Sequence, residues 1–263
     1  MSSLGPRSLR GPTTFLCLLT SSALIAACGS AGGGAGNAAG TASSSAGAAA
    51  SSGSCAAGAA ASGSTYTVPQ EPDSGVNTPA GKCWASIKPT PMNVTDVGTL
   101  PSGESAEFWI AWSAQDLYIR AYATTWPLEN NGGANWWQSD ATEFDVSGTD
   151  GHGGVFSNGD KYQIAITSDG VLQTSGVNGS AASPAPTPKV QIVNNKGWYS
   201  ELIVPWATLQ VKPAKGGKYE FDIGEDFGDS SGNRVAQMAW QATPGGTNDW
   251  HDDTSQWGDI VLG

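Results

Sequence analysis

Residues 136–146 read Trp136-Trp137-Gln138-Ser139-Asp140-Ala141-Thr142-Glu143-Phe144-Asp145-Val146. From Thr142 onward the side chains alternate, so that Thr142, Phe144 and Val146 can face one way while Glu143 and Asp145 face the other. Alternation with a period of two is typical of a half-buried β-strand. The stretch therefore predicts a strand that is entered from a loop carrying two tryptophans.

The same pattern recurs along the C-terminal part of the chain. Residues 107–112 and 117–122 are apolar-rich runs joined by Ser113-Ala114-Gln115-Asp116, which predicts a hairpin. Further strand-like runs, separated by turn residues, lie at 143–147, 162–167, 190–193, 198–204, 219–223, 234–240 and 260–262. No segment keeps a helical stripe with caps. Many short strands at this spacing predict an all-β, antiparallel, jelly-roll-like sandwich. Before them, residues 65–101 are expected to be irregular, with short edge strands around 84–87.

Composition places this domain at residues 65–263. All 11 tryptophans lie after residue 80, and Glu71 is the first acidic residue. About 200 residues are enough to bury a full core. The net charge of −11 makes nucleic acid an unlikely partner and argues against charge-driven binding to anionic lipid.

The N-terminus carries the features of a secretion signal at residues 1–27. Arg7 and Arg10 precede an apolar segment, 15–27, that is shorter than the roughly 20 residues of a membrane span. The segment ends at Ala26-Ala27-Cys28, which resembles the bacterial lipoprotein box, in which the cysteine is acylated before cleavage. This resemblance implies lipidation of Cys28 and a secreted, surface-exposed protein held to the cell membrane by its lipid anchor.

Residues 28–64 are expected to form a disordered linker. From residue 29 onward all but Asn37, Thr41 and Cys55 are Gly, Ala or Ser, so nothing there can form a core. The root-mean-square span would be roughly 30–36 Å. Of the two cysteines left after cleavage and acylation, Cys55 and Cys83 either pair in an oxidising exterior or remain free thiols.

Trp137 and Glu143 have chemistry that suits a sugar. A pyranose ring has apolar C–H faces and a rim of hydroxyls. An indole can cover a face, and a carboxylate accepts hydrogen bonds from the hydroxyls. Trp126 and Trp136 also lie in predicted loops and could extend a binding face. Five other tryptophans lie in strand-like or Pro-Trp contexts and are expected in the core: Trp109, Trp112, Trp198, Trp206 and Trp240.

Five sequence blocks together resemble the family 9 carbohydrate-binding modules of bacterial xylanases and related surface proteins. In order they are DLYI (116–119), WQSDATEF (137–144), YSELIVPWATL (199–209), YEFDI (219–223) and WGDIVL (257–262). The resemblance covers roughly residues 80–263. It implies a β-sandwich that holds one sugar unit between two tryptophans at one end, without catalysis.

The resemblance also implies roles for individual residues. By its W-x-x-D-x-x-E context, Trp137 is similar to the first tryptophan of the family slot and Glu143 to its carboxylate partner. Trp250, shortly before the last strand, falls where the second tryptophan is found, with Asn248 as the nearby amide. Where the family has an arginine after a tyrosine, this chain has Gln163, which keeps hydrogen-bonding capacity but lacks the charge and fork of arginine.

Members of the family carry structural calcium, and Asp222, Glu225, Asp226 and Asp229 are the candidate ligands here. The expected partners are carbohydrate chain ends or small sugars, and association with polysaccharide catabolism is implied. Two other functions stay open. One is an interaction or structural module that has lost the sugar site. The other is a glycoside hydrolase that uses paired carboxylates such as Glu143 and Asp145.

Overall fold

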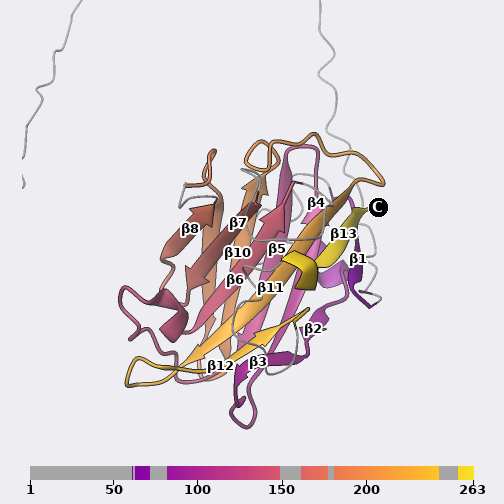
Figure 1. The fold of residues 1–263 in the computed structure, drawn as a ribbon. Helices are drawn as coiled ribbons and strands as arrows, with labels where there is room; N and C mark the ends of the chain where they lie inside the picture. The colour runs from indigo at the N-terminus through magenta and orange to yellow at the C-terminus, as the bar shows by residue number, and fades with distance from the viewer. Residues whose placement is uncertain (1–60, 62, 72–81, 149–160, 177–180, 243–253) are drawn as a thin grey trace, which may run out of the picture. The chain divides into compact units, whose positions relative to one another are not determined.

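In the computed structural model, the described residues are 61, 63–71, 82–148, 161–176, 181–242 and 254–263, and they form two β-sheets packed face to face (Figure 1). The predicted all-β sandwich is confirmed. No helix in these ranges is long and apolar enough to cross a membrane. Residues 1–27, Cys28 and nearly all of the expected linker lie outside the described residues.

Within the described ranges, the larger sheet contains eight strands. β11 (Lys218–Gly228) is the longest, and it pairs with β6 on one edge and with β13 and then β12 on the other. The path along the sheet is β1-β13-β11-β6-β7-β8, and β3 pairs with β12. The bounds of the other strands are β1 (Thr65–Val68), β3 (Val94–Gly98), β6 (Ala141–Ser147), β7 (Lys161–Thr167), β8 (Leu172–Gly176), β12 (Arg234–Ala239) and β13 (Gly258–Leu262). Only the β1–β13 pair is parallel among these pairings.

The smaller sheet has the order β2-β4-β5-β10-β9. Its strands are β2 (Thr90–Met92), β4 (Ser105–Trp112), β5 (Asp116–Thr124), β9 (Thr187–Val193) and β10 (Gly197–Pro205). The predicted hairpin is β4–β5, which closes with Trp112 opposite Leu117.

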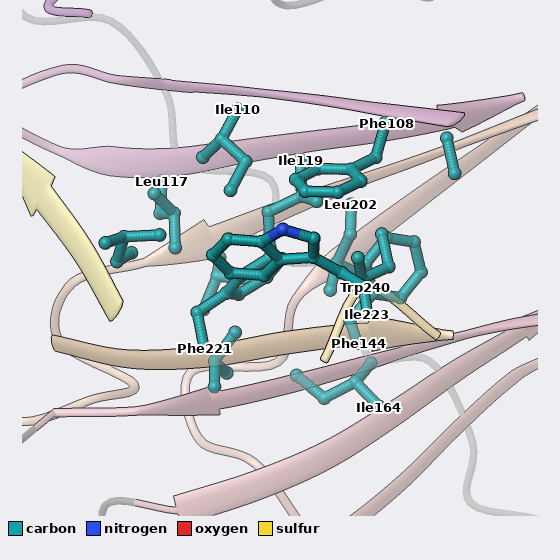
Figure 2. Packing of buried hydrophobic residues seen from close by; sticks show 14 of the residues in the cluster. Phe108, Ile110, Leu117, Ile119, Phe144, Ile164, Leu202, Phe221, Ile223 and Trp240 are labelled. Carbon is teal, nitrogen blue, oxygen red and sulfur yellow. The ribbon is translucent and has the colours of Figure 1, made fainter. Parts of the chain in front are cut away.

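The core lies between the two sheets and is rich in aromatic rings (Figure 2). Trp240 packs against Phe108 and Phe221, with ring centroids 5.5 and 6.0 Å apart. All five tryptophans expected in the core are buried. Trp109 differs from the other four because it faces the outer side of β4, where it clusters with Trp84 of the 3-10 helix η1 (Lys82–Ser86).

Two local features differ from the sequence-based expectation. The segment around 84–87 forms η1 rather than an edge strand, while β1, β2 and β3 occupy other parts of the lead-in. Cys83 in η1 is buried and disulfide-bonded, and every other cysteine lies outside the described residues, so its pairing with Cys55 stays a prediction.

Strand β6 is buried on both faces, whereas the sequence predicted one exposed face. Phe144 and Val146 lie in the core as expected, and Thr142 reaches Ser200 of the opposite sheet at 2.7 Å. Glu143 and Asp145 point to the outer side but are 2% and 0% exposed. These two carboxylates of β6 are therefore shielded from solvent although they lie on the outer side of the sheet.

Candidate functional site

The two tryptophans that open the site lie on a short 3-10 helix, η2 (Trp136–Gln138), in the connection from β5 to β6. Asp140, which is fully buried, holds this connection to the sheet. Its Oδ2 accepts a hydrogen bond from the Glu129 backbone N–H at 2.8 Å, and its Oδ1 accepts one from the Gly228 N–H at 2.9 Å. Burial raises the pKa of Asp140 to about 6, although both backbone N–H groups favour its ionised form.

Trp137 is 38% exposed, and its ring meets Trp136 edge-to-face with centroids 5.6 Å apart. This contact limits the orientations open to the Trp137 indole. Trp136 is half-buried and lines a hollow of about 150 Å³ together with Gln163, Gln173 and Thr174. The structure thus places Trp136 directly beside Gln163, and leaves Trp137 presenting its indole to solvent.

Glu143 lies at the centre of a hydrogen-bonded network on the outer side of the larger sheet. Its Oε2 accepts from Gln163 Nε2 at 3.0 Å, and its Oε1 accepts from Gln237 Nε2 at 2.9 Å. Gln163 belongs to β7 and Gln237 to β12, and the strands lie in the order β12-β11-β6-β7. The three side chains therefore connect four neighbouring strands. The predicted pair of Glu143 and Gln163 is therefore in direct contact.

Gln237 and Asp226 were not identified from the sequence as neighbours of Glu143. Burial raises the pKa of Asp226 well above its ordinary value, the neighbouring Glu143 carboxylate raises it further, and Arg234, 3.0 Å from Asp226 Oδ1, opposes this. Gln237 and Asp226 are both distant in sequence from Glu143. The only available signal concerned Gln237, because the alternation of β12 places it on the same side as Val235 and Ala239.

Two predicted site residues, Asn248 and Trp250, lie at 243–253, outside the described residues. The described segment that follows them does approach the same side of the larger sheet. Thr254, in the 3-10 helix η4 (Thr254–Gln256), is within 3.3 Å of the Lys161 Nζ on β7. Lys161 also pairs with Glu220 on β11 at 2.7 Å, and both side chains are buried.

The four candidate calcium ligands do not converge. Asp222 accepts from the backbone N–H groups of Ile223 and Gln241, whereas Asp226 pairs with Arg234. Glu225 faces the core, where it accepts from Thr142 and Trp198, and Asp229 accepts from the N–H groups of its own turn. Across the described ranges, no three His, Cys, Asp or Glu side chains are arranged to hold a metal ion. These four residues therefore do not form a calcium site in the described structure. The expectation of calcium still rests on the acidic charge and on the family resemblance.

The described part of the site thus places an exposed indole on a turn that Asp140 holds to the sheet, near a carboxylate bonded to two amides on the outer side of a β-sandwich. Residues 76–263 match the family model described as "Carbohydrate family 9 binding domain-like". The match covers more than half of the chain, and the chain belongs to this family.

Solved structures and a curated relative agree with this fold. A family 9 carbohydrate-binding module from Caldicellulosiruptor kristjanssonii superimposes with a TM-score of 0.65 in its glucose complex and 0.63 in its cellotriose complex, at 18% identity in both. These comparisons cover 76% and 75% of this chain, and 95% and 93% of the module. Endo-1,4-beta-xylanase A of Thermotoga neapolitana is 22% identical over 180 residues, which are 68% of this chain but only 16% of the xylanase.

Proposed function

We propose that the domain binds a neutral sugar ring without transforming it, and that the ring lies against Trp137 beside the Glu143–Gln163–Gln237 network. The observation that carries the proposal is the exposed Trp137 indole on a turn fixed to the sheet by Asp140. Trp250 would cover the second face of the ring, and Asn248 would add an amide, as the family resemblance implies. Glucose and cellotriose, which are bound to the C. kristjanssonii module, are the first ligands to test.

The expected affinity is weak. Each indole would cover roughly 60–80 Å² of apolar sugar face, which corresponds to about 1.5–2 kcal/mol at about 25 cal/mol per Å². Hydrogen bonds to hydroxyls add about 0.5–1.5 kcal/mol each. After the cost of association, the sum fits a dissociation constant in the micromolar-to-millimolar range. A slot closed on two faces also favours a chain end over the middle of a chain.

Titration calorimetry with glucose and cellotriose tests the proposal. Trp137→Ala should abolish measurable binding and leave the melting temperature nearly unchanged, because the indole is exposed. A core tryptophan would instead lose about 3–5 kcal/mol of stability on truncation. Ile192→Ala removes a side chain of similar exposure, 41%, from β9 and is the matched control, with binding expected to be unchanged.

Two results would contradict the proposal. One is wild-type affinity for both sugars in Trp137→Ala. The other is the appearance of reducing ends at enzyme-like turnover that is lost in Glu143→Gln, which would instead favour a glycoside hydrolase.

We further propose that the domain is presented at the cell surface by a lipid on Cys28 and a flexible linker, in association with polysaccharide catabolism. The Ala26-Ala27-Cys28 sequence and the Gly/Ala/Ser run after it support this arrangement. Cys28→Ser should move the protein from the membrane fraction to the soluble secreted fraction, as followed by immunoblotting. A wild-type protein that is already wholly soluble after secretion would refute the anchor.

A further inference from the structure

A second hollow, of about 400 Å³, lies at one end of the smaller sheet and shares no lining residue with the hollows beside Trp136. Three segments build it. The connection before β4 contributes Glu104, the end of β5 contributes Tyr122 and Trp126, and the β9–β10 turn contributes Asn195 and Lys196. The hollow is therefore separate from the site already described.

Its aromatic wall consists of an exposed indole, Trp126, and a tyrosine, Tyr122, that is held in place by its neighbours. Trp126 is 45% exposed, which is more than Trp137 at 38%. Tyr122 contacts Tyr199 in a tilted arrangement, with ring centroids 4.5 Å apart and ring planes at 39°, and the guanidinium of Arg120 lies 4.1 Å from the Tyr199 ring centroid. Aromatic and cation–π contacts of this kind limit ring orientation. The hollow thus offers an apolar face whose floor is already ordered.

Its polar groups include one carboxylate and two exposed side chains. Glu104 lines the hollow, and its Oε1 accepts from Thr125 Oγ1 at 3.1 Å, while its Oε2 is shielded from solvent. Burial also raises the pKa of Glu104. Asn195 and Lys196 are exposed on the opposite segment and can donate hydrogen bonds. A ligand that suits this lining has one flat apolar face and several hydroxyl groups.

We propose that this hollow is a second carbohydrate subsite, in which one neutral pyranose ring lies on Trp126 with its hydroxyls directed to Glu104, Asn195 and Lys196. The class of ligand rests on the proposed function, whereas the location of the subsite rests on the hollow that Trp126 lines. A neutral ligand is favoured over an anionic one because the chain has a net charge of −11. Two separate subsites on one domain would allow it to hold two chains, or two parts of one chain, with a gain in avidity.

Nuclear magnetic resonance of the indole N–H groups in the full chain can test the two sites separately. Cellotriose is the probe, and resonances are assigned from Trp126→Ala and Trp137→Ala. In Trp137→Ala, the Trp126 resonance should still shift and saturate by about 10–20 mM cellotriose, as expected for a site of millimolar affinity. In Trp126→Ala, the Trp137 resonance should keep its wild-type titration curve.

Two further variants examine the lining of the hollow. Glu104→Gln keeps the size of the side chain and removes its charge, and should weaken the binding reported by Trp126 by about threefold to tenfold. Ile192→Ala, on the neighbouring strand β9 but outside the hollow, is the control and should leave that binding unchanged.

Each outcome decides between the two sites. A Trp126 resonance that stays still while Trp137 shifts refutes the second subsite and leaves the proposed function intact. A Trp126 shift that disappears in Trp137→Ala also refutes it, because the signal then only reports the first site. A Trp126 shift without any Trp137 shift supports the second subsite and refutes the slot at Trp137. No shift at either residue in the wild type refutes both.

Discussion

Gln163 occupies the position at which the family resemblance leads one to expect an arginine. In the structure its amide donates to Glu143 from the neighbouring strand and supplies no positive charge. Glu143 also accepts a hydrogen bond from Gln237, and it lies next to Asp226, whose pKa is raised by burial. A neutral amide next to Glu143 also leaves a sugar hydroxyl without the two-pronged donor that a guanidinium would supply.

Truncation of Gln163 should therefore cost stability as well as affinity. Gln163→Ala leaves the buried Glu143 Oε2 without its amide donor, and an unsatisfied buried group costs about 1–3 kcal/mol. The change should appear as a lower midpoint in urea with an unchanged slope. Gln173→Ala, in the adjacent strand β8 on the rim of the same hollow, is the matched control, with a shift below about 0.5 kcal/mol. Equal midpoints for the two variants would mean that the amide does not stabilise Glu143.

At the scale of elements, the sequence predicted what is local and missed what depends on distant pairing. The β4–β5 hairpin and the long strands β6, β7 and β10 were predicted because their alternation and turn residues lie within a few positions. Strands β1, β3 and β8 have four or five residues and are defined mainly by their partners. Their pairing is set by the rest of the sheet, and short runs alone carry too little pattern.

The same alternation explains why the four acidic residues at 222–229 do not converge in the described structure. Along β11, Asp222 and Asp226 point to the outer side while Glu225 points into the core, because successive side chains of a strand face opposite ways. Acidic residues that are near in sequence along a strand are therefore divided between its two faces. The same reasoning could have excluded Glu225 from the sequence alone.

The turn that carries Trp137 depends on a close approach between η2 and the end of β11, which the sequence did not indicate. A Cβ on Gly228, where β11 ends, would lie 2.8 Å from the Gln138 carbonyl oxygen. Only glycine lets η2 and the end of β11 approach so closely, and the Gly228 N–H then bonds to Asp140. The position of Trp137 is therefore set by β11 as much as by its own loop.

For the whole molecule, buried carboxylates are the main electrostatic feature. Burial raises the pKa of Glu104, Asp140 and Glu225, and repulsion from neighbouring carboxylates adds to the effect at Asp140 and Glu225. Asp222 and Asp226 are shifted in the same direction, also chiefly by burial. Asp229, on the turn after β11, has its pKa lowered by hydrogen bonds from that turn and opposes this trend. The folded chain thus holds protons that the unfolded chain releases.

This difference fixes the sign of the pH dependence. Between the unfolded pKa of about 3.8 and the folded pKa of about 6, Asp140 binds more protons when folded, so its contribution to stability falls as the pH rises through that window. At about 1.36 kcal/mol per unit, the loss from this group is at most about 3 kcal/mol. Glu225, Asp222 and Asp226 change stability in the same direction, and above their folded pKa values the effect levels off.

The melting temperature should accordingly be higher at pH 5 than at pH 7.5, as measured by calorimetry in a chelating buffer. The same scans in calcium test for the structural calcium that the family resemblance implies. A hard cation relieves repulsion only among ionised carboxylates, and a ligand that binds the folded state raises its stability. Calcium should therefore raise the melting temperature more at pH 7.5 than at pH 5.

Asp140→Asn should flatten the pH dependence in chelator without removing the response to calcium, because Asp140 is held by backbone N–H groups. A melting temperature that rises from pH 5 to 7.5 in chelator would show that the buried carboxylates are ionised and paired. Equal melting temperatures with and without calcium would refute calcium binding.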